Sequence, residues 1–133
     1  MRLVCDTNVL IAGLVADGLC RDIVKRRLPG HELFTSEALL AELDEKLRDK
    51  FGVDPDKVPF LKIYRERARV IAAAPLAEPV CRDHDDEEVL AVAIAANAEA
   101  IVTGDKDLLS LKSHGGIPIL SPRQFVELLD RIT

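Results

Sequence analysis

Apolar residues along this chain follow two patterns, short continuous runs and longer stretches in which they recur every three or four positions. A short apolar run predicts a buried strand, and a three-to-four spacing predicts a helix that packs on one side. Strands are therefore predicted at 3–5, 31–36, 99–105 and 117–122. Helices are predicted at 9–15, 18–28, 37–51, 56–73, 85–98, 106–112 and 122–132.

N-capping residues and first-turn acids indicate where three of these helices begin. Ser36 is a favoured N-cap for the helix that follows it, and Ser121 with Pro122 supplies an N-cap and a first-turn proline for the last helix. The acidic run that starts at Asp85 suits the first turn of a helix, because negative charge there complements the helix dipole. Segment 74–84, with two prolines, is predicted to be extended, and a further strand there is left open.

The alternation of strands and helices predicts an α/β fold with a parallel sheet covered on both faces. No repeat, low-complexity tract or linker divides the chain, so residues 1–133 are predicted to form a single domain. Apolar residues make up 48% and aromatic residues only 4%, which indicates a globular protein with an aliphatic core. No apolar stretch approaches the roughly 20 residues that a membrane span needs, and no signal-peptide pattern is present. We therefore expect a cytoplasmic protein with no membrane partner.

The net charge of −5 disfavours a broad nucleic-acid-binding surface. It does not exclude a nuclease, because an acidic metal site adds negative charge that bound cations offset. Two local basic clusters do occur, at 21–27 and 62–69. Cys5, Cys20 and Cys81 are widely spaced and form no zinc pattern, so we expect free thiols in a reducing compartment.

Four acidic residues follow strands or open helices at matching places in the predicted fold. Asp6 follows the first strand, Asp105 follows the third, Asp86 lies at the start of the helix before the third, and Glu42 lies in the helix after the second. Sites in open parallel sheets form beyond the carboxyl ends of strands, so these acids are expected to converge. Carboxylates brought together repel one another, and a hard divalent cation such as Mg²⁺ or Mn²⁺ relieves that repulsion. Such an ion can polarise a phosphodiester and activate water.

Each acid also has a purely structural interpretation. Asp6 and the acids at 85–86 are favoured helix caps, Asp105 and Asp107 are favoured turn residues, and a single glutamate such as Glu42 is usually solvated. The functional interpretation depends on the four occurring together. Other chemistries find no support, because no phosphate-binding glycine loop occurs and the histidines have no recognisable nucleophile partner. The histidines are His31, His84 and His114.

Four segments of the chain resemble the PIN-domain family. They are VCDTNVLIAGL at 4–14, SEALLAEL at 36–43, the long segment 83–109 that ends in TGDKDLL, and IPILSPRQFVELL at 117–129. Within the family the chain is most similar to the small prokaryotic toxin components of toxin–antitoxin systems, the VapC-type toxins. The resemblance implies a three-layer α/β/α sandwich with a central parallel sheet. It also implies a Mg²⁺- or Mn²⁺-dependent endoribonuclease that hydrolyses single-stranded RNA.

The resemblance carries the four catalytic acids of the family onto particular residues. These are Asp6, Glu42, Asp86 and Asp105, with Asn8 and Thr103 as polar supports of the metal shell. Asp85 is the alternative to Asp86, and the role of Asp107 is left open. The implied mechanism has three of the aspartates holding a metal, while Glu42 binds a second ion or orients the attacking water. Lys106 is either a phosphate contact or a solvated turn lysine.

The resemblance also suggests partners: an RNA substrate, an antitoxin that blocks the acidic cleft, and a second copy in a homodimer. Two alternatives stay open, a PIN nuclease with a housekeeping role in RNA processing and a catalytically degenerate PIN scaffold. A phosphoryl-transfer receiver domain also carries acids at strand ends. It is disfavoured, because only Ser121 and Pro122 follow the last strand, where a receiver has a lysine.

Overall fold

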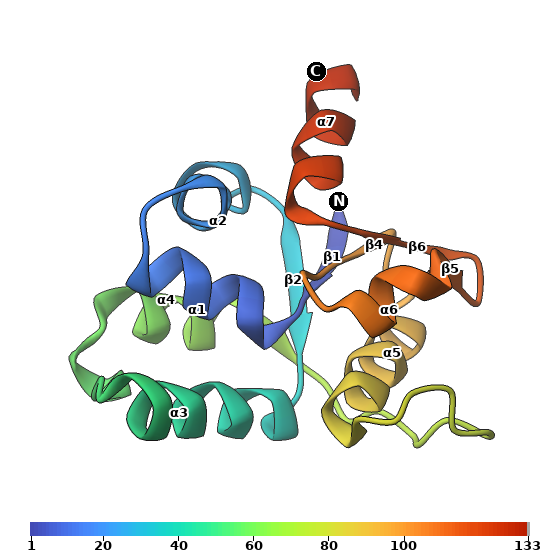
Figure 1. Ribbon diagram of the computed structural model, residues 1–133, viewed down its shortest axis with the longest axis horizontal. Coiled ribbons are helices and arrows are strands. Elements are labelled where there is room, and N and C mark those ends of the chain that lie inside the picture. The colour runs from blue at the N-terminus through green and yellow to red at the C-terminus, as the bar shows by residue number, and fades with distance from the viewer. Residues whose placement is uncertain (133) are drawn as a thin grey trace.

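Six strands form the central sheet of the computed structural model, which describes residues 1–132 (Figure 1). The strands are β1 (Arg2–Cys5), β2 (Glu32–Thr35), β3 (Arg69–Val70), β4 (Ala100–Val102), β5 (Ser113–His114) and β6 (Ile117–Leu120). Their order is β3-β2-β1-β4-β6-β5, and every neighbouring pair except β5 and β6 is parallel. The predicted parallel sheet is thus confirmed, with one short antiparallel strand added at its edge.

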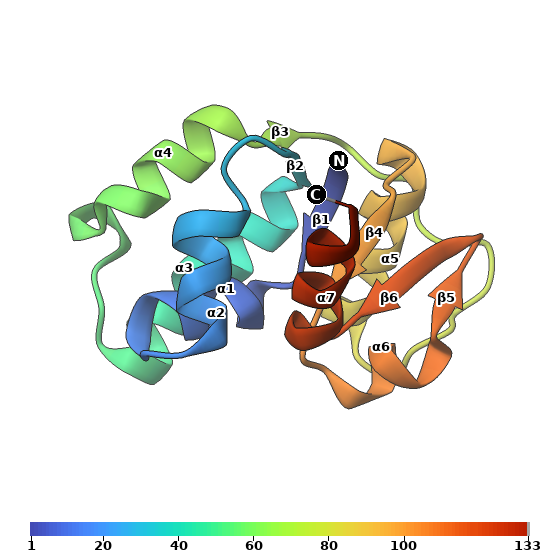
Figure 2. The ribbon, with the colours of Figure 1, turned by 90° about the horizontal axis from the view of Figure 1, so that it is seen from above.

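Helices connect these strands and cover both faces of the sheet. They are α1 (Thr7–Val15), α2 (Leu19–Asp22), α3 (Glu37–Phe51), α4 (Pro59–Arg67), α5 (His84–Ala96), α6 (Lys106–Leu111) and α7 (Pro122–Ile132). A π-helical turn, η1 (Ile23–Arg27), continues α2, and a 3₁₀ turn, η2 (Pro55–Lys57), precedes α4. Figure 2 shows α1 to α4 on one side of β1 and α5 with α6 on the other. None of the described helices is long and apolar enough to cross a membrane.

Alternating side chains of the strands divide the hydrophobic core in two. In β1, Leu3 and Cys5 join one cluster, while Val4 joins the other together with Ile101 of β4. The first cluster lies under α1, η1, most of α3, α4 and α7, and the second lies under α5 and α6. Because the side chains alternate every two residues, apolar side chains lie on both faces of the sheet. This is the pattern of a sheet buried between two helical layers. The three-layer α/β/α sandwich is therefore confirmed.

The predicted N-caps are present. The Ser36 hydroxyl accepts a hydrogen bond from the backbone N–H of Leu39 at 3.2 Å, at the start of α3. At α7, Gln124 N–H donates to the Ser121 hydroxyl at 3.1 Å, and Ser121 N–H donates to the Gln124 side chain at 2.9 Å. This reciprocal pair is a capping box, and it satisfies two donors that the helix itself leaves unpaired.

The predicted helix at 56–73 is wrong after Arg67. α4 ends at Arg67, and Arg69–Val70 form β3 against β2, where the Ile71 N–H also donates to the Thr35 carbonyl at 2.9 Å. The free edge of β2 offers backbone hydrogen bonds that outweigh the helical spacing of these residues. Of the described residues 74–83, none belongs to a strand.

Two other local features depart from the predicted elements. The predicted helix at 18–28 starts at Leu19 and widens into a π turn at Ile23, where the Leu28 N–H donates to the Ile23 carbonyl at 2.9 Å. A hairpin that the apolar pattern did not predict pairs β5 with β6. Gly115 and Gly116 form its two-residue turn, both with positive φ, as a tight turn of this kind requires.

The close packing of α1 on α2 and η1 depends on Gly13. A Cβ at this position would lie 2.5 Å from Val24 Cγ2 and 2.8 Å from the Cys20 carbonyl oxygen. We expect Gly13→Ala to destabilise the protein by about 1–3 kcal/mol, because the two elements would have to move apart. Urea denaturation measures this. Gly104→Ala is the control, since a Cβ there meets nothing within 4 Å. Equal stability of the two variants would contradict the tight contact.

Candidate active site

Polar residues follow directly after the parallel strands at the carboxyl edge of the sheet. Asp6 follows β1 and Thr103 follows β4, and their backbone N–H groups continue the ladder, donating to the Val102 and Leu120 carbonyls, each at 2.9 Å. Asp6 and Thr103 are both buried. Because the strands are parallel and adjacent, side chains that follow them lie beside one another at this edge.

The Thr103 hydroxyl joins two of the predicted acids. It donates to Asp6 Oδ2 at 2.7 Å and accepts a hydrogen bond from the Asp105 N–H at 3.0 Å. Burial raises the pKa of Asp6, and the hydrogen bond from Thr103 opposes that rise; the Lys46 charge also lowers this pKa, and the Asp105 charge raises it. One threonine therefore fixes the Asp6 carboxylate and ties it to the turn that carries Asp105.

Three carboxylates meet beside this threonine. Asp86, Asp105 and Asp107 each offer an oxygen, and these oxygens all lie within 4.8 Å of one another. Asp105 also caps α6, since its Oδ1 accepts from the Leu108 N–H at 2.9 Å. Asp86, rather than Asp85, is thus the member of that pair placed in the group. Asp107, whose role the sequence left open, lies in the group as well.

The Asp86 carboxylate is buried without a full set of partners. The residue is 6% exposed, and its Oδ2 atom is buried with no hydrogen-bond partner. Burial raises its pKa to about 7, with further contributions from the charges of Asp105, Asp83, Asp6 and Asp107. A buried carboxylate oxygen facing other acids lacks a positive partner, and a divalent cation would supply it. The donors are all oxygens, which suits Mg²⁺ or Mn²⁺.

Glu42 lies at the side of the site formed by α3. The residue is 9% exposed, its Oε1 pairs with Lys46 Nζ at 2.7 Å, and its Oε2 is buried without a hydrogen-bond partner. Burial raises the pKa of Glu42, Lys46 opposes this, and the charges of Asp85 and Asp6 add to it. Lys46 Nζ also donates to Asn8 Oδ1 at 3.3 Å, so the predicted supporting residue Asn8 contacts a lysine.

The four consecutive acids at 85–88 point to different partners. Asp85 is exposed and lines a small surface pocket with Glu42 and Lys46, whereas Asp86 joins the acidic group. Glu88 Oε1 accepts from the Ser36 hydroxyl at 2.8 Å, which links the start of α5 to the start of α3. These are the helices that carry Asp86 and Glu42. A helical turn sends consecutive side chains in different directions, so four adjacent acids have separate roles.

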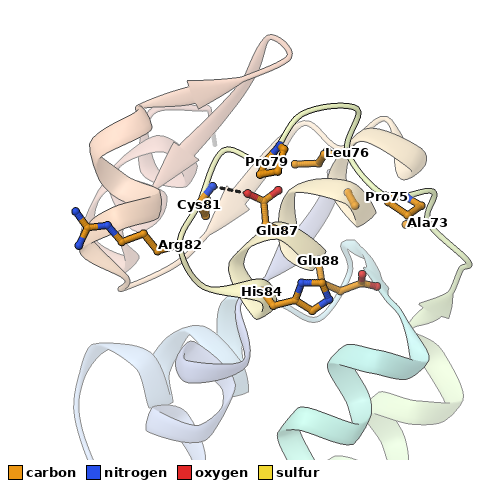
Figure 3. A pocket seen from close by; sticks show the side chains of 10 residues that line it. Ala73, Pro75, Leu76, Pro79, Cys81, Arg82, His84, Glu87 and Glu88 are labelled. Atoms are coloured by element: carbon orange, nitrogen blue, oxygen red, sulfur yellow. Dashed lines mark hydrogen bonds between the residues drawn. The ribbon is translucent and has the colours of Figure 1, made fainter.

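Glu87 holds the segment that precedes α5. Its carboxylate accepts hydrogen bonds from the backbone N–H groups of Val80 and Cys81, and Figure 3 shows it pointing toward this segment. The segment and α5 enclose a pocket of about 310 Å³. Burial, with the Glu87 charge and the acids of the site, raises the pKa of the Cys81 thiol to about 11. The thiol stays protonated at neutral pH and is a weak nucleophile.

A pocket of about 470 Å³ adjoins the acidic group. Its lining residues come from α1, α2, the turn after β4, α6 and the start of α7, namely Asn8, Val9, Ala12, Cys20, Gly104, Asp105, Lys106, Asp107 and Pro122. Asp105 and Asp107 thus border an open space, while Asp6 and Asp86 are buried and do not line it. Lys106 is the basic residue of this lining.

The two basic clusters are largely engaged in ion pairs. Arg21 pairs with Asp17, Arg65 pairs with Asp44, and Arg27 Nη2 lies 2.8 Å from Asp130 Oδ1. Arg26 and Arg69 also have carboxylate partners, Asp22 and Glu32. Several of these pairs are largely exposed, with Arg26 81% and Arg69 68% exposed, so they contribute little to stability.

Sequence reasoning missed three residues of the site. They are Lys46, Glu87 and Glu88. Lys46 and Glu88 have partners distant in the sequence, Asn8 and Ser36, and Glu87 binds the backbone of a segment whose path the sequence pattern did not predict. The one available signal for Lys46 was its position four residues after Glu42, which favours an ion pair on a helix.

Two comparisons with known proteins concern the family of the chain. The family model described as PIN domain matches residues 2–107, a range that includes Asp6, Glu42, Asp86, Asp105 and Asp107. An uncharacterized protein of Methanocaldococcus jannaschii, MJ1680, is 28% identical over 148 aligned residues, which cover 98% of this chain and 93% of that protein.

The raised pKa of Asp86 has a consequence for stability without metal. From the usual aspartate pKa of about 3.9 up to about 7, the folded state holds a proton that the unfolded chain has lost. The stability that the protonated Asp86 carboxyl gives the folded state is fully present below about pH 4. It is lost as the pH rises through 7. In EDTA, we expect the melting temperature to fall between pH 5 and pH 8 by about 5 °C more in the wild type than in Asp86→Asn.

Differential scanning calorimetry checks this expectation. Asp17→Asn is the control, because its carboxylate is 92% exposed and it should keep the wild-type pH dependence. Asp6 and Glu42 act in the same direction, so some pH dependence remains in Asp86→Asn. An unchanged pH dependence in that variant would contradict the burial of an uncompensated Asp86 carboxylate.

Proposed function

This chain belongs to the PIN-domain family, and on that premise we propose that it is a divalent-metal-dependent endoribonuclease acting on single-stranded RNA. Membership in the family implies nuclease activity. The observation that carries the metal dependence is the meeting of Asp86, Asp105 and Asp107, with one buried Asp86 oxygen left without a partner. A Mg²⁺ or Mn²⁺ ion satisfies that oxygen and offsets the repulsion among the acids.

Asp86 and Asp105 would hold this ion, and Asp107 lies within reach of the same position. Asp6, the third predicted ligand, lies outside this group of three and is joined through Thr103 to the turn that carries Asp105. When bound, the ion supplies Lewis-acid polarisation of the phosphate and lowers the pKa of its bound water. The protein orients the ligands: Thr103 fixes Asp6, and the α6 cap fixes Asp105. Ligands held in this way need no rearrangement when RNA enters, which favours the transition state.

The pocket beside the acids supports a single-stranded substrate. Its volume of about 470 Å³ leaves room for a nucleotide of an unpaired strand, whose base is free to turn into a pocket. Lys106 lies in the lining, where an ammonium would meet a phosphate. The net charge of −5 fits binding that depends on the metal ion more than on a basic surface.

We further propose that the enzyme acts in the cytoplasm as the toxin of a toxin–antitoxin pair. Its antitoxin would cover the acidic cleft, and a second copy of the chain would form a homodimer. Large apolar side chains that are half exposed offer contact surface for either partner, among them Phe51, Ile63 and Ile132. A housekeeping role in RNA processing uses the same chemistry and is the alternative.

Purified protein with Mn²⁺ should cleave an end-labelled single-stranded RNA, and EDTA should abolish the cleavage. Asp86→Asn and Asp105→Asn should each lower the rate about 100-fold or more, because each removes a charge that holds the ion. Denaturing gels measure the products. Asp17→Asn should retain full activity. Equal cleavage by Asp105→Asn would show that the activity belongs to a contaminant or another site, and cleavage of DNA at the same rate would contradict specificity for RNA.

Expression in a bacterial host distinguishes the toxin from the housekeeping enzyme. The wild type should arrest growth, and Asp105→Asn, at the same protein level, should not, because arrest requires RNA cleavage. Growth curves with immunoblots of the expressed protein measure this. Unaffected growth with an enzyme that is active in vitro would favour the processing role.

A further inference from the structure

Lys46 enters the site from α3 and makes contacts on two sides. Its Nζ atom lies 2.7 Å from Glu42 Oε1 and 3.3 Å from Asn8 Oδ1, and its side chain is only 22% exposed. Asn8 belongs to the first turn of α1, two residues after Asp6. The ammonium is thus held between the helix that follows β1 and the helix that carries Glu42.

The surroundings of this ammonium differ from those of an ordinary pair on a helix surface. Exposed pairs four residues apart contribute little, because water screens both charges. Here the Glu42 carboxylate is buried, and its other oxygen has no hydrogen-bond partner. Because little water reaches the buried carboxylate, the attraction between the Lys46 ammonium and Glu42 is weakly screened.

The acids of the site consequently fall into two sets. Asp86, Asp105 and Asp107 form the first set. Among the described residues, no lysine, arginine or histidine side chain makes a hydrogen bond or ion pair with these three carboxylates. Glu42, by contrast, already has a positive partner that reaches across to Asn8. An ion bound at Glu42 would have to displace the ammonium or accept its repulsion at short range. No such obstacle exists at the other set.

We propose that the Lys46 ammonium takes the place of a second metal ion at Glu42, so that the protein binds one divalent ion, at Asp86 and Asp105. This inference rests on the proposed metal-dependent function. Lys46 is a positioning residue: it orients Glu42 and Asn8 and supplies on that side the positive charge that a second ion would bring. Glu42 then acts on substrate or water as a carboxylate held by a lysine, without a metal of its own.

Calorimetric titration of the full chain with Mn²⁺ alone, without RNA, tests the inference. The wild type should bind one ion, and Lys46→Met should bind two, because the freed Glu42 carboxylate and the Asn8 oxygen become available. Electron paramagnetic resonance gives an independent readout, since two neighbouring Mn²⁺ ions couple magnetically. Lys46→Arg keeps the cation and should bind one ion. Lys50→Met, one turn further along α3, is the matched control for loss of a lysine and should also bind one.

Far-UV circular dichroism and thermal unfolding establish that each variant is folded before titration. Two ions in the wild type, or one ion in folded Lys46→Met, would overturn the inference. Should Lys46→Met fail to fold, Lys46→Gln takes its place with the same expected count. No ion in either the wild type or the variant would overturn the proposed metal-dependent function together with the inference, so the count distinguishes the two failures.

Discussion

The mutual repulsion of carboxylates at the carboxyl edge of the sheet is the constraint on which this structure depends. Adjacent parallel strands β1 and β4 end at the same level, so Asp6 lies beside Thr103, whose hydroxyl also binds the Asp105 N–H. Burial strengthens the repulsion, because little water reaches Asp6 to screen it. The fold relieves part of it through Thr103, the α6 cap and Lys46. What remains at Asp86 is the electrostatic basis of a cation site.

The site has one side with hydrogen bonds between helices and one open side. On the first side, Glu88 accepts from Ser36 at the start of α3, and Lys46 of α3 donates to Asn8 of α1. On the open side, Asp105 and Asp107 border the pocket. Carboxylates that are held in place before an ion arrives lose little conformational freedom when it binds. Holding them close together without an ion lowers the stability of the metal-free protein. The same groups therefore weaken the empty protein and strengthen the loaded one.

Local signals account for most of the fold. Spacing of apolar residues and the capping residues Ser36 and Ser121 were sufficient for α3 and α7, because a helix start depends on neighbours within one turn. The strand β3 was missed, since the spacing at 69–73 is helical and the free edge of β2, more than thirty residues earlier, supplies the competing hydrogen bonds. The strand at 117–122 was predicted, but its hairpin with β5 was missed because β5 has only two residues, too few for an apolar period.

The sequence by itself determined the α/β class, the family and the acidic residues that follow strands, since each depends on residue type and short-range order. Only the tertiary structure decided which of the four acids at 85–88 enters the site, that Asp107 lies with Asp86 and Asp105, and that Lys46 also reaches Asn8 of α1. These outcomes depend on the rotation of α5 and on the distance between α1 and α3. Packing of the two cores sets both, and no local pattern encodes it.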